Sequence, residues 1–166
     1  TEYCLYGLLH YQRQMDRYAR QQRDRQWKQL DTRLAGDVRV GILGLGELGG
    51  KVAQDLVRFG YRVSGWSRRP RRIEHVRCLH GDEALRELLP QTDVLFCVLP
   101  STPETHGLLN AETLALLPDD AALINAGRGS LIDETALLAR LDAGLLRFAL
   151  LDVFAEEPLP DNHPLW

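Results

Sequence analysis

Three glycines follow an apolar run and precede a helical pattern in VRVGILGLGELGGKVAQDL, and their spacing is GxGxxG. In a strand–loop–helix frame, the first such glycine permits a tight turn and the second lets the backbone approach a pyrophosphate. The third lets the helix pack closely on the strand, and N–H groups at the helix start then face the phosphates. Outside such a frame the motif indicates only a tight glycine turn. The residues expected to bind a dinucleotide in this motif are Gly44, Gly46, Glu47, Leu48 and Gly49.

A short basic stretch, GWSRRP, includes the end of the next apolar run. In dinucleotide sites this position contacts the adenosine ribose, and sites that prefer NAD usually have Asp or Glu there. Here Ser67 stands at the expected position of the acid, with Arg68 and Arg69 directly after it. A carboxylate would repel a 2′-phosphate, whereas a hydroxyl and guanidinium groups would bind one by charge-assisted hydrogen bonds. These residues therefore favour NADPH over NADH.

The basic run that contains this stretch, SRRPRR, has other interpretations. It could be a solvated loop or a nuclear-type basic sequence. It could also be part of a nucleic-acid-binding surface, but the net charge of −3 argues against general affinity for polynucleotides. We therefore expect no nucleic-acid partner.

Apolar runs and helical patterns alternate through the rest of the chain, which is typical of crossovers between parallel strands. The runs are almost continuously hydrophobic, as in strands buried on both faces. We therefore expect an α/β fold with a Rossmann-type doubly wound parallel sheet, the frame that the glycine motif needs. Asp133 is expected to cap the last helix and Gly144 to follow its end. The expected strands are 38–43, 61–66, 93–99, 121–126 and 147–153, and the expected helices are 48–59, 82–89, 111–117 and 133–143.

Residues 2–30 show a different pattern. Large apolar side chains recur there at steps of three and four, which predicts one long amphipathic helix followed by an arm. The helix could pack on its own domain, or it could form a subunit or interdomain interface, and the sequence leaves both open. We expect a helical arm and dimerisation segment at 1–34, a nucleotide-binding domain at 35–166, and a homodimer. The apolar stripe consists of Leu5, Leu8, Tyr11, Met15 and Tyr18.

The composition is that of an ordinary globular protein, with 45% hydrophobic and 26% charged residues. No apolar run approaches the roughly 20 residues that span a bilayer, and the N-terminus lacks the features of a signal peptide. We expect a cytoplasmic protein with no membrane partner. The three cysteines are odd in number and lack CxxC spacing, so reduced thiols are expected rather than disulfides or a metal site.

Four parts of the sequence together resemble the D-isomer-specific 2-hydroxyacid dehydrogenase family, and within it the NADPH-dependent glyoxylate and hydroxypyruvate reductases. The parts are VGILGLGELGGKVA; GWSRR; LPSTPETHGLLN with LINAGRGSLIDETAL; and LDVFAEEPLPDNHPLW. They follow the family's order between residues 39 and 166. The resemblance implies that a hydride from NADPH reduces a small 2-oxo acid while a protonated histidine acts as the acid. It also implies that residues 2–30 help to form a dimer.

The resemblance assigns individual residues as well. Arg128 matches the catalytic arginine, whose guanidinium would bind the substrate carboxylate and polarise its ketone. Without the resemblance, the same arginine could be an exposed residue in a turn. Glu157 matches the glutamate that orients the catalytic histidine and raises its pKa, and Asp152 matches a residue that contacts the nicotinamide carboxamide. Further cofactor contacts are expected from Leu99, Pro100, Thr105, Ala126 and Arg128.

In the family, the catalytic histidine follows the segment at which this sequence ends, and none of the five histidines here replaces it convincingly. The first half of the family's substrate domain is also absent. We therefore expect the cofactor-binding part of a longer protein, with little or no activity alone. The alternative is a free-standing NADP-binding or dimerisation module without chemistry of its own.

Overall fold

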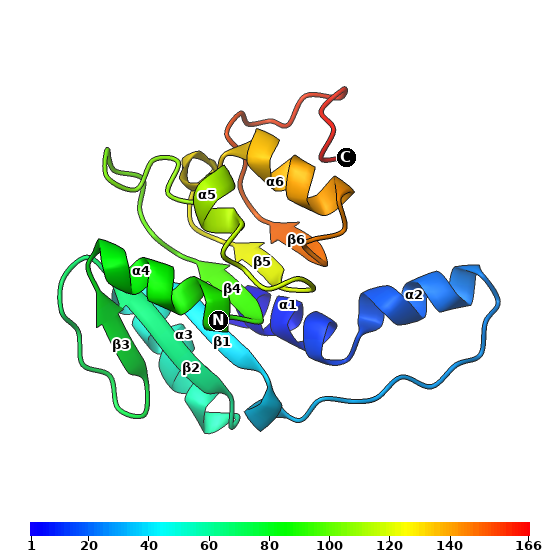
Figure 1. Ribbon diagram of the computed structural model, residues 1–166, viewed down its shortest axis with the longest axis horizontal. Coiled ribbons are helices and arrows are strands. Elements are labelled where there is room, and N and C mark those ends of the chain that lie inside the picture. Colours follow the sequence, from blue (N-terminus) through cyan, green and yellow to red (C-terminus); the bar gives the residue numbers. More distant parts are fainter.

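The computed structural model describes every residue, 1–166, and contains a six-stranded parallel sheet between layers of helices (Figure 1). The strands are β1 (Arg39–Leu43), β2 (Arg62–Ser67), β3 (Arg77–His80), β4 (Val94–Cys97), β5 (Ala122–Asn125) and β6 (Phe148–Leu151). They lie in the order β3-β2-β1-β4-β5-β6, and every pair is parallel. Because this is the doubly wound order of dinucleotide-binding sheets, the predicted Rossmann-type fold is confirmed.

The five expected strands are present, and β3 is an additional strand that the sequence did not predict. It lies at the edge of the sheet and pairs only with β2. Its sequence, RCLH, has exposed ends and half-buried central residues. An edge strand of this kind lacks the continuous hydrophobic run of a central parallel strand, so no strand pattern marks it.

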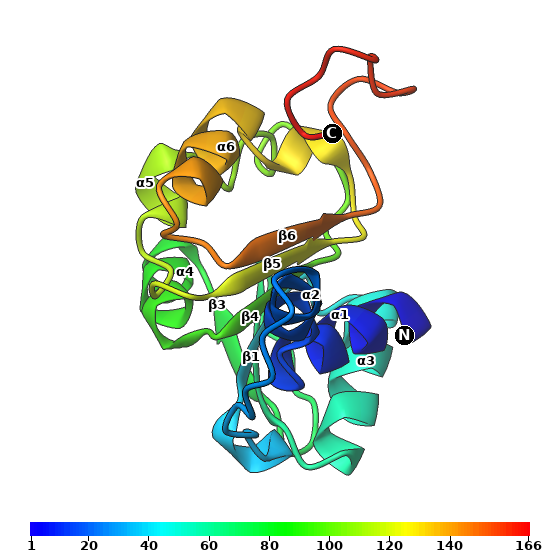
Figure 2. The same cartoon turned by 90° about the vertical axis from the view of Figure 1, so that its right-hand side faces the viewer.

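Helices cover both faces of the sheet. They are α1 (Glu2–Gln12), α2 (Met15–Arg23), α3 (Glu47–Arg58), α4 (Asp82–Leu88), α5 (Ala111–Leu114) and α6 (Glu134–Asp142), with the short 3-10 turns η1 (Ala35–Asp37), η2 (Leu89–Gln91) and η3 (Gly129–Leu131). Figure 2 shows α1 and α3 on one face and α4, α5 and α6 on the other. The predicted ends of α6 are confirmed, since Asp133 accepts a hydrogen bond from the Ala136 N–H at 3.1 Å and Gly144 has φ +67°. The helix expected at 111–117 is shorter and ends at Leu114.

Each face of the sheet has its own hydrophobic core. Val40, Ile42 and Phe96 belong to the core that includes Leu8 of α1 and Leu56 of α3. Alternate strand residues belong to the second core, which lies beneath α4, α5 and α6. Successive side chains of a strand point to opposite faces, so hydrophobic residues are needed at nearly every position of the central strands.

Within residues 2–30 we expected one long helix followed by an arm, but two separate helices precede the arm. α1 ends at Gln12 and α2 begins at Met15. Between them, Gln14 has φ +56°, a left-handed conformation that interrupts a right-handed helix. A turn at Asp24 and Arg25 follows α2, and residues 26–34 have no regular secondary structure before η1 begins.

The apolar stripe of this segment divides between the core and solvent. Leu8 and Tyr11 of α1 are buried in the same core as β1 and β5. Met15 and Tyr18 of α2 are 53% and 37% exposed. α1 therefore packs on its own domain, whereas α2 leaves its large apolar residues accessible.

Asp93, directly before β4, anchors the end of the arm. Its carboxylate lies 2.8 Å from the Arg33 guanidinium and 2.7 Å from that of Arg39, and it accepts the Arg39 backbone N–H at 2.8 Å. Burial opposes ionisation of Asp93, but the hydrogen bonds from Arg39 and Arg33 outweigh it and hold the pKa of the carboxyl below its ordinary value. The arm is thereby tied to the start of β1.

None of the helices has the length and apolar character needed to cross a bilayer. The cytoplasmic location stays a prediction. The three cysteines are free thiols, of which Cys4 and Cys97 are buried and Cys78 is half-buried. Burial raises the pKa of the Cys97 thiol to about 12, so this thiol is un-ionised at neutral pH.

Candidate dinucleotide-binding site

The loops that carry the predicted site residues follow β1, β2, β4, β5 and β6 at one edge of the sheet. The strand register aligns their carboxyl ends: Leu43 of β1 pairs with Trp66 of β2 and Cys97 of β4. Across the rest of the sheet, Asn125 of β5 lies between Cys97 and Leu151 of β6. The strand order reverses between β1 and β4, and ligands of open α/β sheets bind in the crevice at this point.

The glycine loop after β1 has the backbone geometry that the motif requires. Gly44 has φ +106°, a conformation that residues with a side chain rarely adopt. A Cβ at Gly49 would lie 1.8 Å from the Gly44 carbonyl oxygen, so α3 can approach the loop this closely only with glycine there. In contrast, a Cβ at Gly46 would have no atom within 4 Å. The second glycine therefore faces open space, where a pyrophosphate could approach the backbone.

α3 begins directly beside this open space. Glu47 is its first residue, and the N-cap residue Gly46 has no side chain to bond the free N–H groups. Gly46, Glu47 and Leu48 are all exposed. The free N–H groups and the positive end of the helix dipole of this 12-residue helix favour an anion at this place.

The end of β2 presents hydroxyl and guanidinium groups, and no carboxylate stands at the position expected to face the ribose. Ser67 is the last residue of β2, and its buried hydroxyl donates a hydrogen bond to the Arg69 carbonyl at 2.8 Å. This bond fixes the turn that carries the two exposed arginines. The Arg68 guanidinium lies 3.3 Å from the carboxylate of Glu104, in the loop after β4.

The loop after β4 is braced by its own hydrogen bonds. The Thr105 hydroxyl donates to the Pro100 carbonyl at 2.7 Å and accepts the Thr102 N–H at 2.9 Å. Leu99 is buried beneath the loop and Pro100 is exposed. Because the Thr105 hydroxyl closes the turn, its contact with a phosphate or ribose stays a prediction.

A buried amide organises the loop after β5. Asn125 is completely buried; its side-chain oxygen accepts the Gly127 N–H at 3.0 Å and its NH₂ group donates to the Arg128 carbonyl at 3.0 Å. These two bonds shape the turn that presents Ala126 and the exposed Arg128. Asn125 was not among the predicted site residues, although a polar residue at the end of a buried apolar strand must find hydrogen-bond partners.

The loop after β6 packs backbone against backbone on the loop after β5. A Cβ at Gly129 would lie 1.9 Å from the carbonyl carbon of Phe154. The Glu157 carboxylate accepts the Phe154 N–H at 2.9 Å, and the Arg128 guanidinium donates to the Gly127 carbonyl at 2.7 Å. The two predicted catalytic residues thus lie on adjoining loops, and each bonds the backbone of its own loop.

The segment that carries Glu157 is also attached to α6. Glu134, the first residue of α6, accepts the Ala155 N–H at 2.9 Å and lies 3.4 Å from the His163 imidazole. Both side chains are largely buried. His163 therefore helps to hold the polypeptide that follows β6.

Asp152 directly follows β6 and is exposed, and its N–H donates to the Asn125 carbonyl at 3.0 Å. Burial raises the pKa of Tyr3 to about 12, and the negative charge of Asp152 contributes to the increase. Tyr3, on α1, was not among the predicted site residues, because its interaction with the Asp152 charge depends on the packing of α1 on the sheet.

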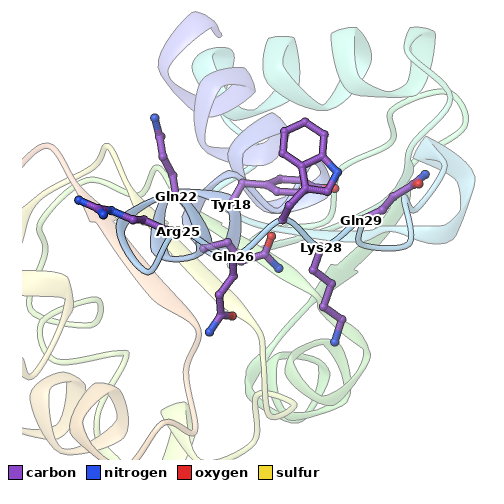
Figure 3. Close-up of a pocket in the computed structure, with 8 residues that line it drawn as sticks. Tyr18, Gln22, Arg25, Gln26, Lys28 and Gln29 are labelled. Atoms are coloured by element: carbon purple, nitrogen blue, oxygen red, sulfur yellow. The ribbon is translucent and has the colours of Figure 1, made fainter.

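A cavity of about 660 Å³ lies elsewhere, on the arm (Figure 3). Figure 3 shows Arg25 and Lys28 extending from it in different directions. Only two of its lining residues are hydrophobic, and it contains neither the glycine loop nor a strand end. This cavity is therefore separate from the candidate dinucleotide site in the loops. The cavity is lined by Tyr18, Gln21, Gln22, Arg25, Gln26, Trp27, Lys28 and Gln29.

The chain is similar in sequence to known dehydrogenases along almost its whole length. The profile of the D-isomer specific 2-hydroxyacid dehydrogenase NAD binding domain matches residues 5–166. Curated relatives include the glyoxylate/hydroxypyruvate reductase A proteins of Photorhabdus laumondii and Serratia proteamaculans, which are 46% and 43% identical over 165 residues. Each alignment covers 99% of this chain and 53% of the relative. The chain thus spans about half the length of these relatives.

Two crystal structures show the same arrangement. The D-isomer specific 2-hydroxyacid dehydrogenase from Xanthobacter autotrophicus Py2, in complex with NADPH and MES, has a TM-score of 0.97 at 46% identity. An NADPH-dependent glyoxylate/hydroxypyruvate reductase from Sinorhizobium meliloti, in complex with NADP and sulfate, has a TM-score of 0.94 at 38% identity. Each superposition covers 99% of this chain, together with 52% and 54% of the respective crystallised chains.

Proposed function

Since the chain belongs to the D-isomer specific 2-hydroxyacid dehydrogenase family, as its NAD binding domain, we propose that it binds NADPH for the reduction of small 2-oxo acids. In this proposal the reduction is carried out by a longer protein of which the chain is the cofactor-binding part. Glyoxylate and hydroxypyruvate are the first substrates to examine, because they are named in the relatives. The observation that carries the proposal is the combination of an open glycine loop with arginines at the end of β2.

The residues of the glycine loop fit a dinucleotide. A Cβ at Gly46 would enter space that is otherwise open, whereas Gly44 and Gly49 shape the turn behind it. In the proposed complex, the N–H groups at the start of α3 bind the pyrophosphate. Leu99 and Ala126 line the cleft farther along the carboxyl edge, and the bound nicotinamide supplies the hydride for the reduction.

The choice of NADPH follows from the end of β2. The Ser67 oxygen can still accept a hydrogen bond, and the exposed Arg68 and Arg69 bring positive charge to the same turn. These groups suit a phosphate on the ribose 2′-oxygen, whereas a carboxylate there would suit a free hydroxyl. The NADPH and NADP of the crystallised neighbours support this choice.

The chemistry proposed for the other residues depends on charge and position. The exposed Arg128 guanidinium binds the carboxylate of the 2-oxo acid and withdraws electron density from its carbonyl group. Glu157 orients the histidine that protonates the carbonyl oxygen, and Asp152 contacts the nicotinamide carboxamide. We assign the proton donor to a histidine outside these 166 residues, so this chain alone binds cofactor without turnover.

The test is an assay of the longer protein with NADPH and a panel of 2-oxo acids, beginning with glyoxylate and hydroxypyruvate. We expect NADPH oxidation that depends on the 2-oxo acid and falls at least about 100-fold in Arg128→Ala. Arg86→Ala is the matched control, because Arg86 is an exposed arginine of α4 and lies outside the site. Binding of NADPH without any reduction across the panel would instead favour a module without chemistry.

We also propose that the N-terminal segment contributes to a homodimer. Trp27 is fully exposed, and Tyr6 and Met15 are 59% and 53% exposed on the same segment. Several large apolar side chains exposed on one segment are typical of an interface. Light scattering should give a dimer for the unmodified chain and a monomer for Met15→Glu with Trp27→Ala. Phe59→Ala, at an exposed apolar residue after α3, should leave the dimer intact.

A further inference from the structure

An ion pair joins two of the loops at the adenosine end of the candidate site. Nη1 of Arg68, after β2, lies 3.3 Å from Oε2 of Glu104, after β4. The side chains are 63% and 60% exposed, so both remain accessible to a ligand. The guanidinium proposed to bind the 2′-phosphate is therefore already in contact with an anion of the same chain.

The position of Glu104 is fixed by its own loop. The Thr105 hydroxyl bonds the Pro100 carbonyl and the Thr102 N–H, which closes the turn around Glu104. A hydrogen bond from the Thr102 side chain, together with the positive charge of Arg68, holds the pKa of the Glu104 carboxyl below its ordinary value. The carboxylate is therefore negatively charged at neutral pH, when a bound 2′-phosphate would be negative as well.

We propose that Glu104 competes with the cofactor 2′-phosphate for Arg68 and so limits the preference of the site for NADPH over NADH. The inference rests on the proposed function, because it needs Arg68 as the ligand of the 2′-phosphate. When the phosphate binds, Arg68 must either be shared between the two anions or give up its contact with the Glu104 carboxylate, and in both cases the two anions lie close together. Their repulsion weakens the binding of cofactors that carry the phosphate and has little effect on those that lack it.

The chain itself can be used for the test, because cofactor binding is the property measured. Dissociation constants would be determined by calorimetry for NADPH, NADH, 2′,5′-ADP and 5′-AMP, with the unmodified chain and Glu104→Gln. We expect Glu104→Gln to bind NADPH and 2′,5′-ADP about three- to fivefold more tightly, which is near the upper end for one exposed charge pair. Binding of NADH and 5′-AMP should change less than about twofold, and the gain should shrink at high salt.

The matched control is Glu112→Gln. Glu112 lies 2.8 Å from the guanidinium of Arg86 in an exposed ion pair of similar accessibility, but on α4 and α5. This variant removes the same charge and should leave all four dissociation constants unchanged. If Glu112→Gln increased the affinity for NADPH as much as Glu104→Gln does, the proposal would be overturned, because the increase would then reflect net charge alone.

A double variant separates this inference from the proposed function. In Arg68→Ala, NADPH should bind more weakly, and adding Glu104→Gln should give less than half of the gain seen with Arg68 present. Suppose that Arg68→Ala weakens NADPH binding, while Glu104→Gln leaves NADPH binding unchanged or makes it weaker. The competition is then refuted, and the assignment of Arg68 to the 2′-phosphate survives. If Arg68→Ala leaves NADPH binding unchanged, both the competition and the assignment of Arg68 to the 2′-phosphate are refuted.

Discussion

A Cβ atom on Gly49 would lie 1.8 Å from the carbonyl oxygen of Gly44, far inside van der Waals contact. The start of α3 therefore lies against the glycine loop only because residue 49 has no side chain. Gly49→Ala should move α3 or the loop, since neither backbone can yield without losing its hydrogen bonds. We expect a loss of about 1–3 kcal/mol in the free energy of unfolding, measured by denaturant titration, together with weaker NADPH binding.

Gly46→Ala should separate folding from binding. A Cβ at this position would meet no atom within 4 Å, and the residue has φ −73°. We expect the free energy of unfolding to change by no more than about 0.5 kcal/mol, because the substitution is on the surface. NADPH should nevertheless bind at least about tenfold more weakly, because the methyl group occupies the space assigned to the pyrophosphate. Unchanged NADPH affinity in this variant would place the cofactor elsewhere.

Gly129→Ala should disturb the junction between the loops after β5 and β6. The added methyl group would lie 1.9 Å from the Phe154 carbonyl carbon, so the segment that carries Glu157 must move. We expect a loss of about 1–3 kcal/mol in the free energy of unfolding, and lower kcat in the longer protein. Gly36→Ala is the control, since its Cβ would lie 3.9 Å from the nearest atom. Equal stability of the two variants would contradict the packing described for this junction.

Asp93 should make the stability of the chain depend on pH in the acid range. The folded-state pKa of its carboxyl lies below the ordinary value, so the ionised form is stabilised more in the folded chain than in the unfolded chain. The resulting stabilisation is present above the unfolded-state pKa of about 3.9 and is lost as pH falls through the lower folded-state pKa.

Asp93→Asn checks this behaviour. The variant should be less stable than the unmodified chain by about 1–2 kcal/mol at neutral pH, since Arg33 and Arg39 are partly exposed and solvent screens the pairs. The difference should decrease below about pH 4 in denaturant titrations. Asp161→Asn, at an exposed aspartate, should have no such effect. A difference that stays constant between pH 7 and pH 3 would show that the charge of Asp93 is not responsible.

The features that could be predicted from sequence are those set by local patterns. The glycine spacing and the apolar runs predicted the sheet, and the capping residues Asp133 and Gly144 gave the ends of α6 because caps act within one turn of a helix. β3 and the interruption at Gln14 could not be predicted in this way. The first is an edge strand with little burial, and the second depends on how α2 and the arm pack.

The same distinction applies to the candidate site. Ser67 and Arg68 could be identified because they follow a predicted strand directly, and the resemblance identified Arg128 and Glu157. The Arg68–Glu104 ion pair could not be found, because it joins loops that meet only when β2 and β4 take their places beside β1. Tertiary contacts between loops carry no periodicity in the sequence, so they must be read from the structure.

Substitution of Arg68 tests whether this chain binds NADPH through the 2′-phosphate. Dissociation constants for NADPH and NADH should be measured by calorimetry with the unmodified chain, Arg68→Ala and the control Arg86→Ala. We predict tighter binding of NADPH than of NADH in the unmodified chain and the control. In Arg68→Ala, NADPH should bind about tenfold or more weakly while NADH changes little, as expected for loss of a charge-assisted hydrogen bond. Unchanged NADPH and NADH binding in Arg68→Ala would show that Arg68 does not bind the 2′-phosphate.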